Sequence, residues 1–208
     1  MIDITHILAT IIIIAVPLFM GVILHEVSHG YVAYRLGDPT AKKAGRLSLN
    51  PVKHVDPLGT IIFPGMLILL KSPFLFGWAK PVPINPSYFQ DPRKGIFWVS
   101  LAGPAANFTL AAVFYMLFVM LQPSLSGALG TFLWFGIFIN IVLGVFNLLP
   151  VPPLDGSKIL ATYLPGRLAA QFMSLEKYGF IILILLILMG FLGWIFGYVR
   201  NFTNFLVS

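Results

Sequence analysis

The chain has 208 residues, of which 58% are hydrophobic and only 10% are charged. Soluble domains carry about 25% charged residues, so this composition excludes an ordinary soluble protein and indicates a single integral membrane domain over residues 1–208. The formal net charge of +6 could suggest a nucleic-acid partner, but the basic residues lie in short loops between apolar runs. Basic loops of this kind set orientation in a membrane, so no nucleic acid is expected as a partner.

Four apolar runs are long enough to cross a bilayer. A hydrocarbon core of about 30 Å needs about 20 helical residues, and the runs at about 7–34, 96–121, 128–149 and 178–199 meet that length. A fifth run, 59–70, would reach only about 18 Å as a helix, and Pro64 lies in its middle, where proline breaks helices. We therefore predict an all-α polytopic membrane protein with four long transmembrane helices and a re-entrant segment at 59–70.

The basic residues predict the orientation of these helices. If 59–70 does not cross, the loops 35–58, 71–95 and 150–177 face one side of the membrane. Those loops hold all 13 Lys and Arg residues except Arg200. Because positively charged loops stay inside, we expect a multi-pass protein of the cell membrane with these loops cytoplasmic and both termini external.

Two of the loops have an unusual composition. Residues 44–59 and 76–89 are rich in Pro, Gly and Asn, with β-branched residues between them. Prolines exclude a helix at 81–86 and suit an edge strand or an extended segment. We predict a small β element near the active site, which is tolerated at membrane depth only where protein or a watery cavity surrounds it.

The first span contains the sequence HEVSH at 25–29. His25 and His29 are four residues apart and share one face of a helix, and Glu26 lies on the neighbouring face. This is the H-E-x-x-H pattern, in which two imidazoles bind zinc and the glutamate acts on a water. Ionisable residues inside a span are rare and usually functional. The alternative is a structural network in which the histidines hydrogen-bond between helices and Glu26 pairs with one of them.

A catalytic zinc needs a third protein ligand and an open position for water. The candidates are His54, Asp56, Asp155 and Glu176. The predicted topology favours Asp155, because the span at 128–149 returns to the side of the first motif and delivers the sequence PPLDG there. A turn or helix-capping aspartate is the alternative for this residue. We expect His54 and Asp56 to be solvated or to lie behind the ligands, and Glu176 to mark the membrane interface.

Two motifs together resemble the site-2 protease family of intramembrane zinc metalloproteases. They are HEVSH at 25–29 and N-x-x-P-x-x-P-L-D-G from Asn147 to Gly156, and LAGPAANF at 101–108 is similar to a third family element. The likeness covers about residues 15–160, within a core of about 7–160 that precedes the C-terminal helix 178–199. It implies that the second motif, through Asp155, supplies the third ligand beside His25 and His29.

The predicted chemistry follows from these residues. His25, His29 and Asp155 would hold one Zn²⁺ per chain, and Glu26 would be the catalytic acid–base. Asn147 is expected to stabilise the developing oxyanion or to orient the substrate, as the resemblance also suggests; a capping or interhelical asparagine is the alternative. We expect Asn107 and Asn140 to form hydrogen bonds between packed helices, with Gly103 allowing close approach.

These features predict a zinc-dependent intramembrane endopeptidase. Its substrate would be a transmembrane protein in the lipid bilayer, cleaved within or near a membrane span. A metal or proton transporter is the main alternative, because intramembrane His, Asp and Glu also line ion pathways. Transporters frequently show internal repeats, and none is visible in this sequence. An inactive binding protein is a third possibility, against which the presence of Glu26 argues.

Overall fold

The computed structural model describes residues 4–70 and 77–208. Lys71 and the rest of 71–76, which belong to the predicted loop 71–95, lie outside the described residues. The α-helices are α1 (Ile4–Arg35), α2 (Thr40–Lys43), α3 (Phe63–Leu69), α4 (Pro92–Leu121), α5 (Ala128–Asn147), α6 (Asp155–Ala161), α7 (Gly166–Met173), α8 (Gly179–Leu188) and α9 (Phe191–Val207). Short 3-10 helices occupy Pro51–His54 (η1), Pro86–Tyr88 (η3) and Ser174–Tyr178 (η4), and a π-helix occupies Pro57–Ile62 (η2).

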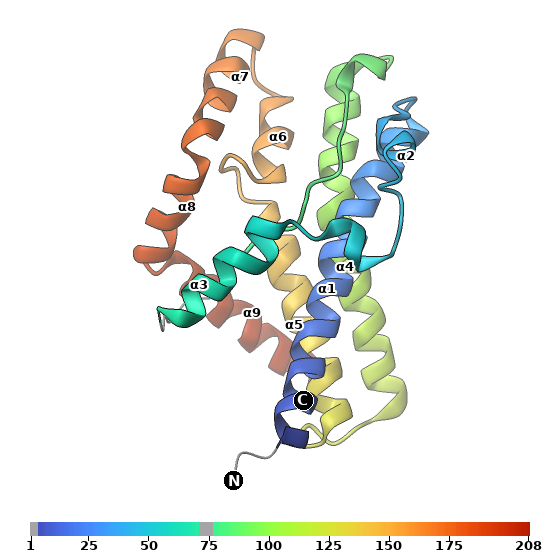
Figure 1. The fold of residues 1–208 in the computed structure, drawn as a ribbon, viewed down its shortest axis with the longest axis vertical. Helices are drawn as coiled ribbons and strands as arrows, with labels where there is room; N and C mark the ends of the chain where they lie inside the picture. The colour runs from blue at the N-terminus through green and yellow to red at the C-terminus, as the bar shows by residue number, and fades with distance from the viewer. Residues whose placement is uncertain (1–3, 71–76) are drawn as a thin grey trace.

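The helices α1, α4 and α5 form the centre of the molecule (Figure 1). α1 and α5 run toward the end that carries α2, and α4 runs the opposite way. Apolar side chains of α4 and α5 interlock in a buried cluster, formed by Leu110, Phe114, Phe118, Leu133 and Ile137. All three helices are long and apolar enough to cross a membrane, which agrees with the first three predicted spans.

The fourth predicted span differs from the structure. The sequence indicated one helix over 178–199, but the chain turns at Gly190, whose φ of 77° lies in the left-handed region that glycine adopts without strain. The apolar stretch that is long enough to cross is instead Gly166–Leu188. After the turn, α9 packs against α5, with Ile195 and Val199 buried against Val142. Both sides of the turn are apolar, so the hydropathy pattern alone did not show the break.

The prediction of a small β element is wrong. No strand occurs in residues 4–70 and 77–208, and 77–85 is extended without pairing to another strand. Its prolines at 81 and 83 have no N–H to donate. Three other N–H groups bond to partners outside any sheet: that of Lys80 to His54 O, and those of Val82 and Asn85 to carboxylates.

The structure also gives no support for a re-entrant loop at 59–70. The chain there forms η2 and α3, one apolar helical stretch from Pro57 to Leu69 that is shorter than the four candidate spans. Pro64 lies in the first turn of α3, where a missing N–H costs little. Asp56 begins the stretch, and its Oδ1 accepts hydrogen bonds from the N–H groups of Leu58 and Gly59.

Candidate metal centre

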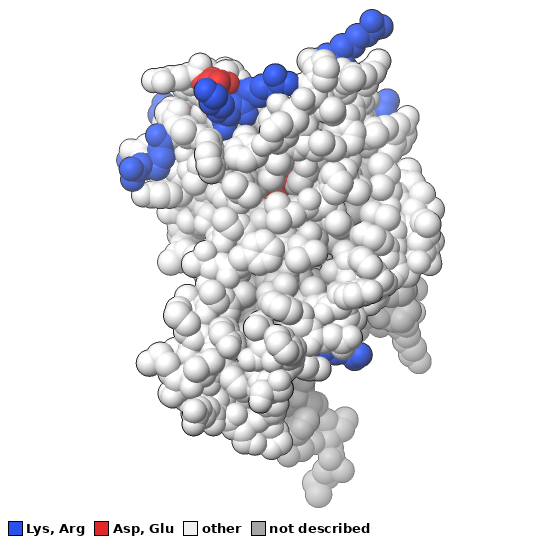
Figure 2. Space-filling model, turned by 180° about the vertical axis from the view of Figure 1, so that it is seen from behind, with Lys and Arg blue, Asp and Glu red and all other residues white. Residues whose placement is uncertain are grey.

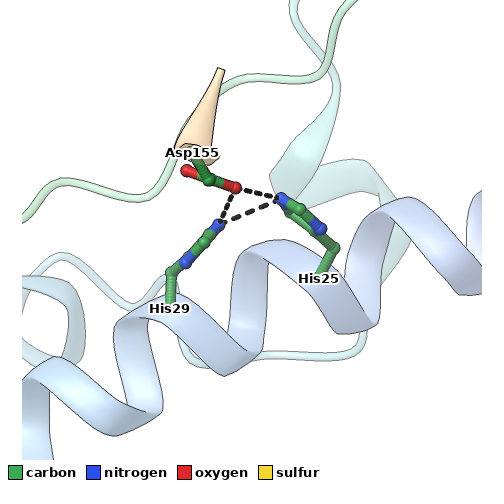
Figure 3. A group of neighbouring side chains, drawn as sticks. All are labelled: His25, His29 and Asp155. Carbon is green, nitrogen blue, oxygen red and sulfur yellow. Dashed lines mark hydrogen bonds and ion pairs between the residues drawn. The ribbon is translucent and has the colours of Figure 1, made fainter. Parts of the chain in front are cut away.

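Three side chains able to bind a metal ion converge between α1 and the start of α6 (Figure 3). Nε2 of His25 and Nε2 of His29 each lie 3.1 Å from Oδ2 of Asp155, and the two Nε2 atoms are 3.0 Å apart. All three residues are buried. Within the part of the chain that the structure describes, they form the only group of three or more such side chains that could share one ion.

Hydrogen bonds on the far side of each imidazole determine which nitrogen is free to bind. His25 Nδ1 lies 2.8 Å from Asn107 Oδ1, and His29 Nδ1 lies 2.6 Å from Val99 O. The Asn107 amide is oriented by its Nδ2, which donates to Gly21 O at 3.1 Å. Carbonyl oxygens only accept, so Nδ1 carries the proton in both rings. Each Nε2 therefore presents its lone pair toward Asp155.

Asn107 and Asn140 form a fully buried polar pair in the bundle. Asn107 Nδ2 lies 3.2 Å from Asn140 Oδ1, and Asn140 Nδ2 donates to Gly136 O at 2.9 Å. Both residues thus bond between or within packed helices, as the sequence indicated. The sequence analysis did not predict that Asn107 also orients His25. Asn107 lies one helical turn after Gly103 and on the same helix face, which was an available signal.

Gly103 brings α4 against the two histidines. A Cβ at this position would lie 2.5 Å from His29 Nε2 and 2.6 Å from His25 Cε1. Any side chain would therefore displace an imidazole. The close approach expected at Gly103 is present, and it occurs at the ligand nitrogens themselves.

Asp155 is held in one orientation by its own short helix. Lys158 Nζ lies 3.3 Å from Asp155 Oδ1, which leaves Oδ2 facing the histidines. Lys158 also places a positive charge beside this carboxyl, which favours its ionised form. The carboxylate is ionised and ready to bind a cation.

The donor set suits zinc. Zinc binds imidazole nitrogen and carboxylate oxygen at about 2.0–2.2 Å in a tetrahedral arrangement, which places neighbouring ligand atoms about 3.3 Å apart. The separations here are 3.0 and 3.1 Å, so shifts of a few tenths of an ångström would admit the ion. Three protein ligands also leave a fourth position for water.

A cavity of about 1090 Å³ lies in front of these ligands. The segment 77–86 forms part of its wall, and α6 and α7 contribute further residues. Glu26 lines the cavity beside the ligands without belonging to them, and its Oε2 accepts a hydrogen bond from Val82 N–H at 2.9 Å. Asn147 also lines the cavity, and its Nδ2 donates to Leu143 O at 3.0 Å. A second N–H of that amide remains for a bound molecule.

The other candidate ligands have different positions. His54 is buried in η1, and its Nε2 lies 2.7 Å from Ser48 O. Asp56 caps η2 and is occupied by backbone N–H groups. Glu176 lines the cavity from η4 but does not join the group of potential ligands. The structure thus brings together His25, His29 and Asp155 and none of the three alternatives.

Comparisons with known proteins identify a family of zinc metalloproteases. The model of peptidase family M50 matches residues 123–191. The chain is 42% identical to the "Putative zinc metalloprotease YwhC" of Bacillus subtilis, over 83% of this chain and 78% of that protein. It is 32% identical to the "Putative zinc metalloprotease Rip2" of Mycolicibacterium smegmatis, over 89% of this chain and 71% of that protein. No solved structure matches the chain.

Proposed function

This chain belongs to peptidase family M50, the site-2 protease family, and is a zinc metalloprotease; from that premise we propose that it cleaves peptide bonds within or close to the membrane spans of other proteins. The observation that carries the proposal is the convergence of His25, His29 and Asp155 on a cavity inside a bundle of apolar helices. A site built on such helices is placed to receive a substrate segment from the bilayer.

In this proposal His25, His29 and Asp155 hold the zinc ion. Zinc at this position would lower the pKa of a bound water toward about 7 and polarise the carbonyl of the scissile peptide. The hydrogen bonds from each Nδ1 to Asn107 and Val99 hold both imidazoles in the tautomer that can bind it. The ion pair with Lys158 holds the carboxylate.

Glu26 is the proposed acid–base catalyst. Its carboxylate lines the cavity next to the three ligands, and Val82 N–H occupies only one of its oxygens. The other oxygen takes the proton of the attacking water and then delivers it to the leaving amine. Such proton transfer contributes about 10² to 10⁴-fold to the rate.

Asn147 is the proposed donor to the substrate carbonyl. It lies at the end of α5, on the cavity wall, with one of its two amide hydrogens free of the bond to Leu143 O. The carbonyl oxygen gains negative charge during attack, and an amide N–H aimed at that oxygen stabilises the transition state more than the ground state. Alternatively, the same contact orients the substrate before attack.

The substrate must reach this site as an extended chain. Peptide groups in a membrane helix are shielded by their own hydrogen bonds, so the helix has to unwind locally before water can attack. Residues of the extended segment 77–85 line the cavity beside the metal ligands, and a substrate strand lying along it would present its peptide groups to the site.

We further propose that the basic loops are cytoplasmic and that the protein resides in the cell membrane. Figure 2 shows lysines and arginines gathered at one end of the molecule, the end that carries α2 and α7 in Figure 1. Helix α1 begins at the opposite end, where the chain also finishes. The positive-inside tendency assigns the basic end to the cytoplasm.

Reconstitution of the purified protein with a synthetic membrane-span substrate tests the function. We expect wild-type protein to cleave the substrate, to lose activity when a chelator strips the metal, and to regain it when zinc is added. Glu26→Gln should keep zinc and lose cleavage by about 10² to 10⁴-fold, because glutamine cannot accept the proton. Zinc movement across proteoliposomes without cleavage, or a zinc-loaded Glu26→Gln variant as active as wild type, would contradict the proposal.

A further inference from the structure

The extended segment 77–85 contacts the proposed catalytic carboxylate directly. Val82 N–H donates to Glu26 Oε2 at 2.9 Å, and the Val82 side chain is buried. Among the described residues, this is the only hydrogen bond that the Glu26 carboxylate makes. The segment therefore determines where one oxygen of Glu26 lies, and hence which way the other oxygen faces.

Gly30 lets this segment lie against α1. It follows Glu26 by one helical turn and shares its face. A Cβ at Gly30 would lie 2.8 Å from Val82 Cγ1 and 2.7 Å from Leu47 Cδ2. Both distances are well inside van der Waals contact, so a methyl group at this position would push Val82 away from the helix.

Arg46 holds the start of the segment. Its side chain is buried, and its guanidinium donates to the backbone oxygens of Lys53 and Lys80. A further contact of 3.4 Å joins Nη2 to Pro81 O. The planar fork of arginine reaches acceptors in two separate loops at once, which one lysine ammonium cannot reproduce. Arg46 thus ties the loop 44–54 to the residues directly before Val82.

Asp38 holds the other end. It is fully buried just beyond α1, and its Oδ2 accepts a hydrogen bond from Asn85 N–H at 2.6 Å. Its Oδ1 accepts from Thr40 N–H at 2.9 Å, which fixes the carboxylate. The segment is therefore anchored on both sides of the one residue that contacts Glu26.

We propose that the segment 77–85 is a positioning element for Glu26, and that Gly30, Arg46 and Asp38 are the residues that set its place. The donor to Glu26 is a backbone N–H, so its position depends on how these anchors hold the segment. This inference rests on the role proposed for Glu26. A misplacement of about 1 Å can cost about 10²-fold in rate, so small shifts of the segment should be measurable.

The first test displaces the segment 77–85 by one substitution in α1 and, separately, by one substitution in the loop 44–54. Gly30→Ala and Arg46→Met should each lower kcat by about 10- to 100-fold with zinc content unchanged, because the atoms nearest the new Cβ at position 30 and the hydrogen-bond partners of Arg46 do not belong to the metal ligands. Retained zinc also shows that α1 and α6 are still assembled. Gly197→Ala is the matched control: it lies in the helix α9 with no atom within 4 Å of a new Cβ, so its kcat should equal that of wild type.

The second test asks whether the loss passes through Glu26. In the Glu26→Gln background, Gly30→Ala should cause no further fall in the residual cleavage, because residues acting through one group are not additive. Adding Val82→Ala to Gly30→Ala should restore part of the rate, because it removes the clash with Val82 Cγ1 and leaves only that with the end of the Leu47 side chain. An equal loss from Gly30→Ala in both backgrounds would assign it a structural role and overturn the inference.

The two proposals fail in different ways. A wild-type protein that binds zinc but cleaves no membrane-span substrate would overturn the proposed function, and this inference with it. An active wild type whose Gly30→Ala and Arg46→Met variants cleave at the full rate would overturn the positioning role alone.

Discussion

Asn107 Oδ1 lies 2.8 Å from His25 Nδ1, across the interface between α4 and α1. This one contact fixes the tautomer of a proposed zinc ligand from a helix that contributes no ligand. Partners behind metal-binding histidines typically account for about 10- to 100-fold in metal affinity. Asn107→Leu should therefore weaken zinc binding by about that factor, measured by competition with a coloured chelator.

Asn204→Leu serves as the control for that substitution. Asn204 Oδ1 accepts a hydrogen bond from Trp134 Nε1 at 2.9 Å, between α9 and α5. Asn204→Leu therefore also removes a hydrogen bond between two helices. Its zinc affinity should match wild type. Equal affinities in Asn107→Leu and wild type would show that His25 needs no partner to present Nε2.

The choice of third ligand is tested by metal content. Asp155→Ala and His29→Ala each remove one of three donors and should leave little bound zinc after dialysis. Asp56→Ala should keep about one zinc per chain while losing stability of about 1 kcal/mol, because Asp56 caps a helix. Loss of zinc from Asp56→Ala with retention in Asp155→Ala would reverse the assignment.

Gly103→Ala tests the close approach of α4 to the ligands. The added methyl group would lie about as near to His29 Nε2 as a bound metal does, since a Cβ at this position falls 2.5 Å from that nitrogen. We expect zinc occupancy to fall sharply, with the helical content from circular dichroism unchanged. A normal zinc content would mean that α4 can move outward without cost.

The stability of the protein should depend on pH through the carboxyl of Asp38. Burial alone would raise the pKa of its carboxyl, but hydrogen bonds from Thr40 and from Asn85 N–H outweigh it and hold the pKa below its usual value. A carboxyl whose pKa is lower in the folded than in the unfolded protein stabilises the fold at pH values above its unfolded pKa of about 3.9. That stabilisation is lost as the pH falls through the pKa of the folded protein. Asp38→Asn should thus be less stable than wild type at pH 7 by about 1–3 kcal/mol.

The measurement for Asp38 is thermal unfolding in detergent over a range of pH. The difference between wild type and Asp38→Asn should shrink as the solution is acidified below about pH 4, because protonation removes the same charge that the substitution removes. A difference that stays constant with pH would mean that the ionised form of Asp38 contributes nothing.

Membrane orientation is tested with single cysteines, which the natural sequence lacks. A cysteine in place of Lys80, an exposed residue of the segment 77–85, should be labelled by an impermeant reagent only after the cells are opened. A cysteine in place of Ser126, in the exposed connection between α4 and α5, should be labelled from outside intact cells. Labelling of position 80 from outside would overturn the proposed orientation.

The sequence by itself determined the features that depend on neighbouring residues. Hydrophobic length located the three central helices because each span must satisfy its backbone hydrogen bonds within itself. The spacing of His25 and His29 placed both imidazoles on one helical face. The short reach of 59–70 likewise excluded a crossing helix there.

Only the tertiary structure decided the features that join distant parts of the chain. Four acidic or histidine residues were possible third ligands, and the packing of α5 against α1 and of α6 against α4 brought Asp155 to the two histidines. Hydropathy did not locate the turn at Gly190, because apolar residues lie on both sides of it. The segment 77–85 looked like a strand, yet its N–H groups bond to Glu26, Asp38 and His54 O. Those partners lie far away in the sequence, and hydrogen bonds of that range are set by which surfaces pack together.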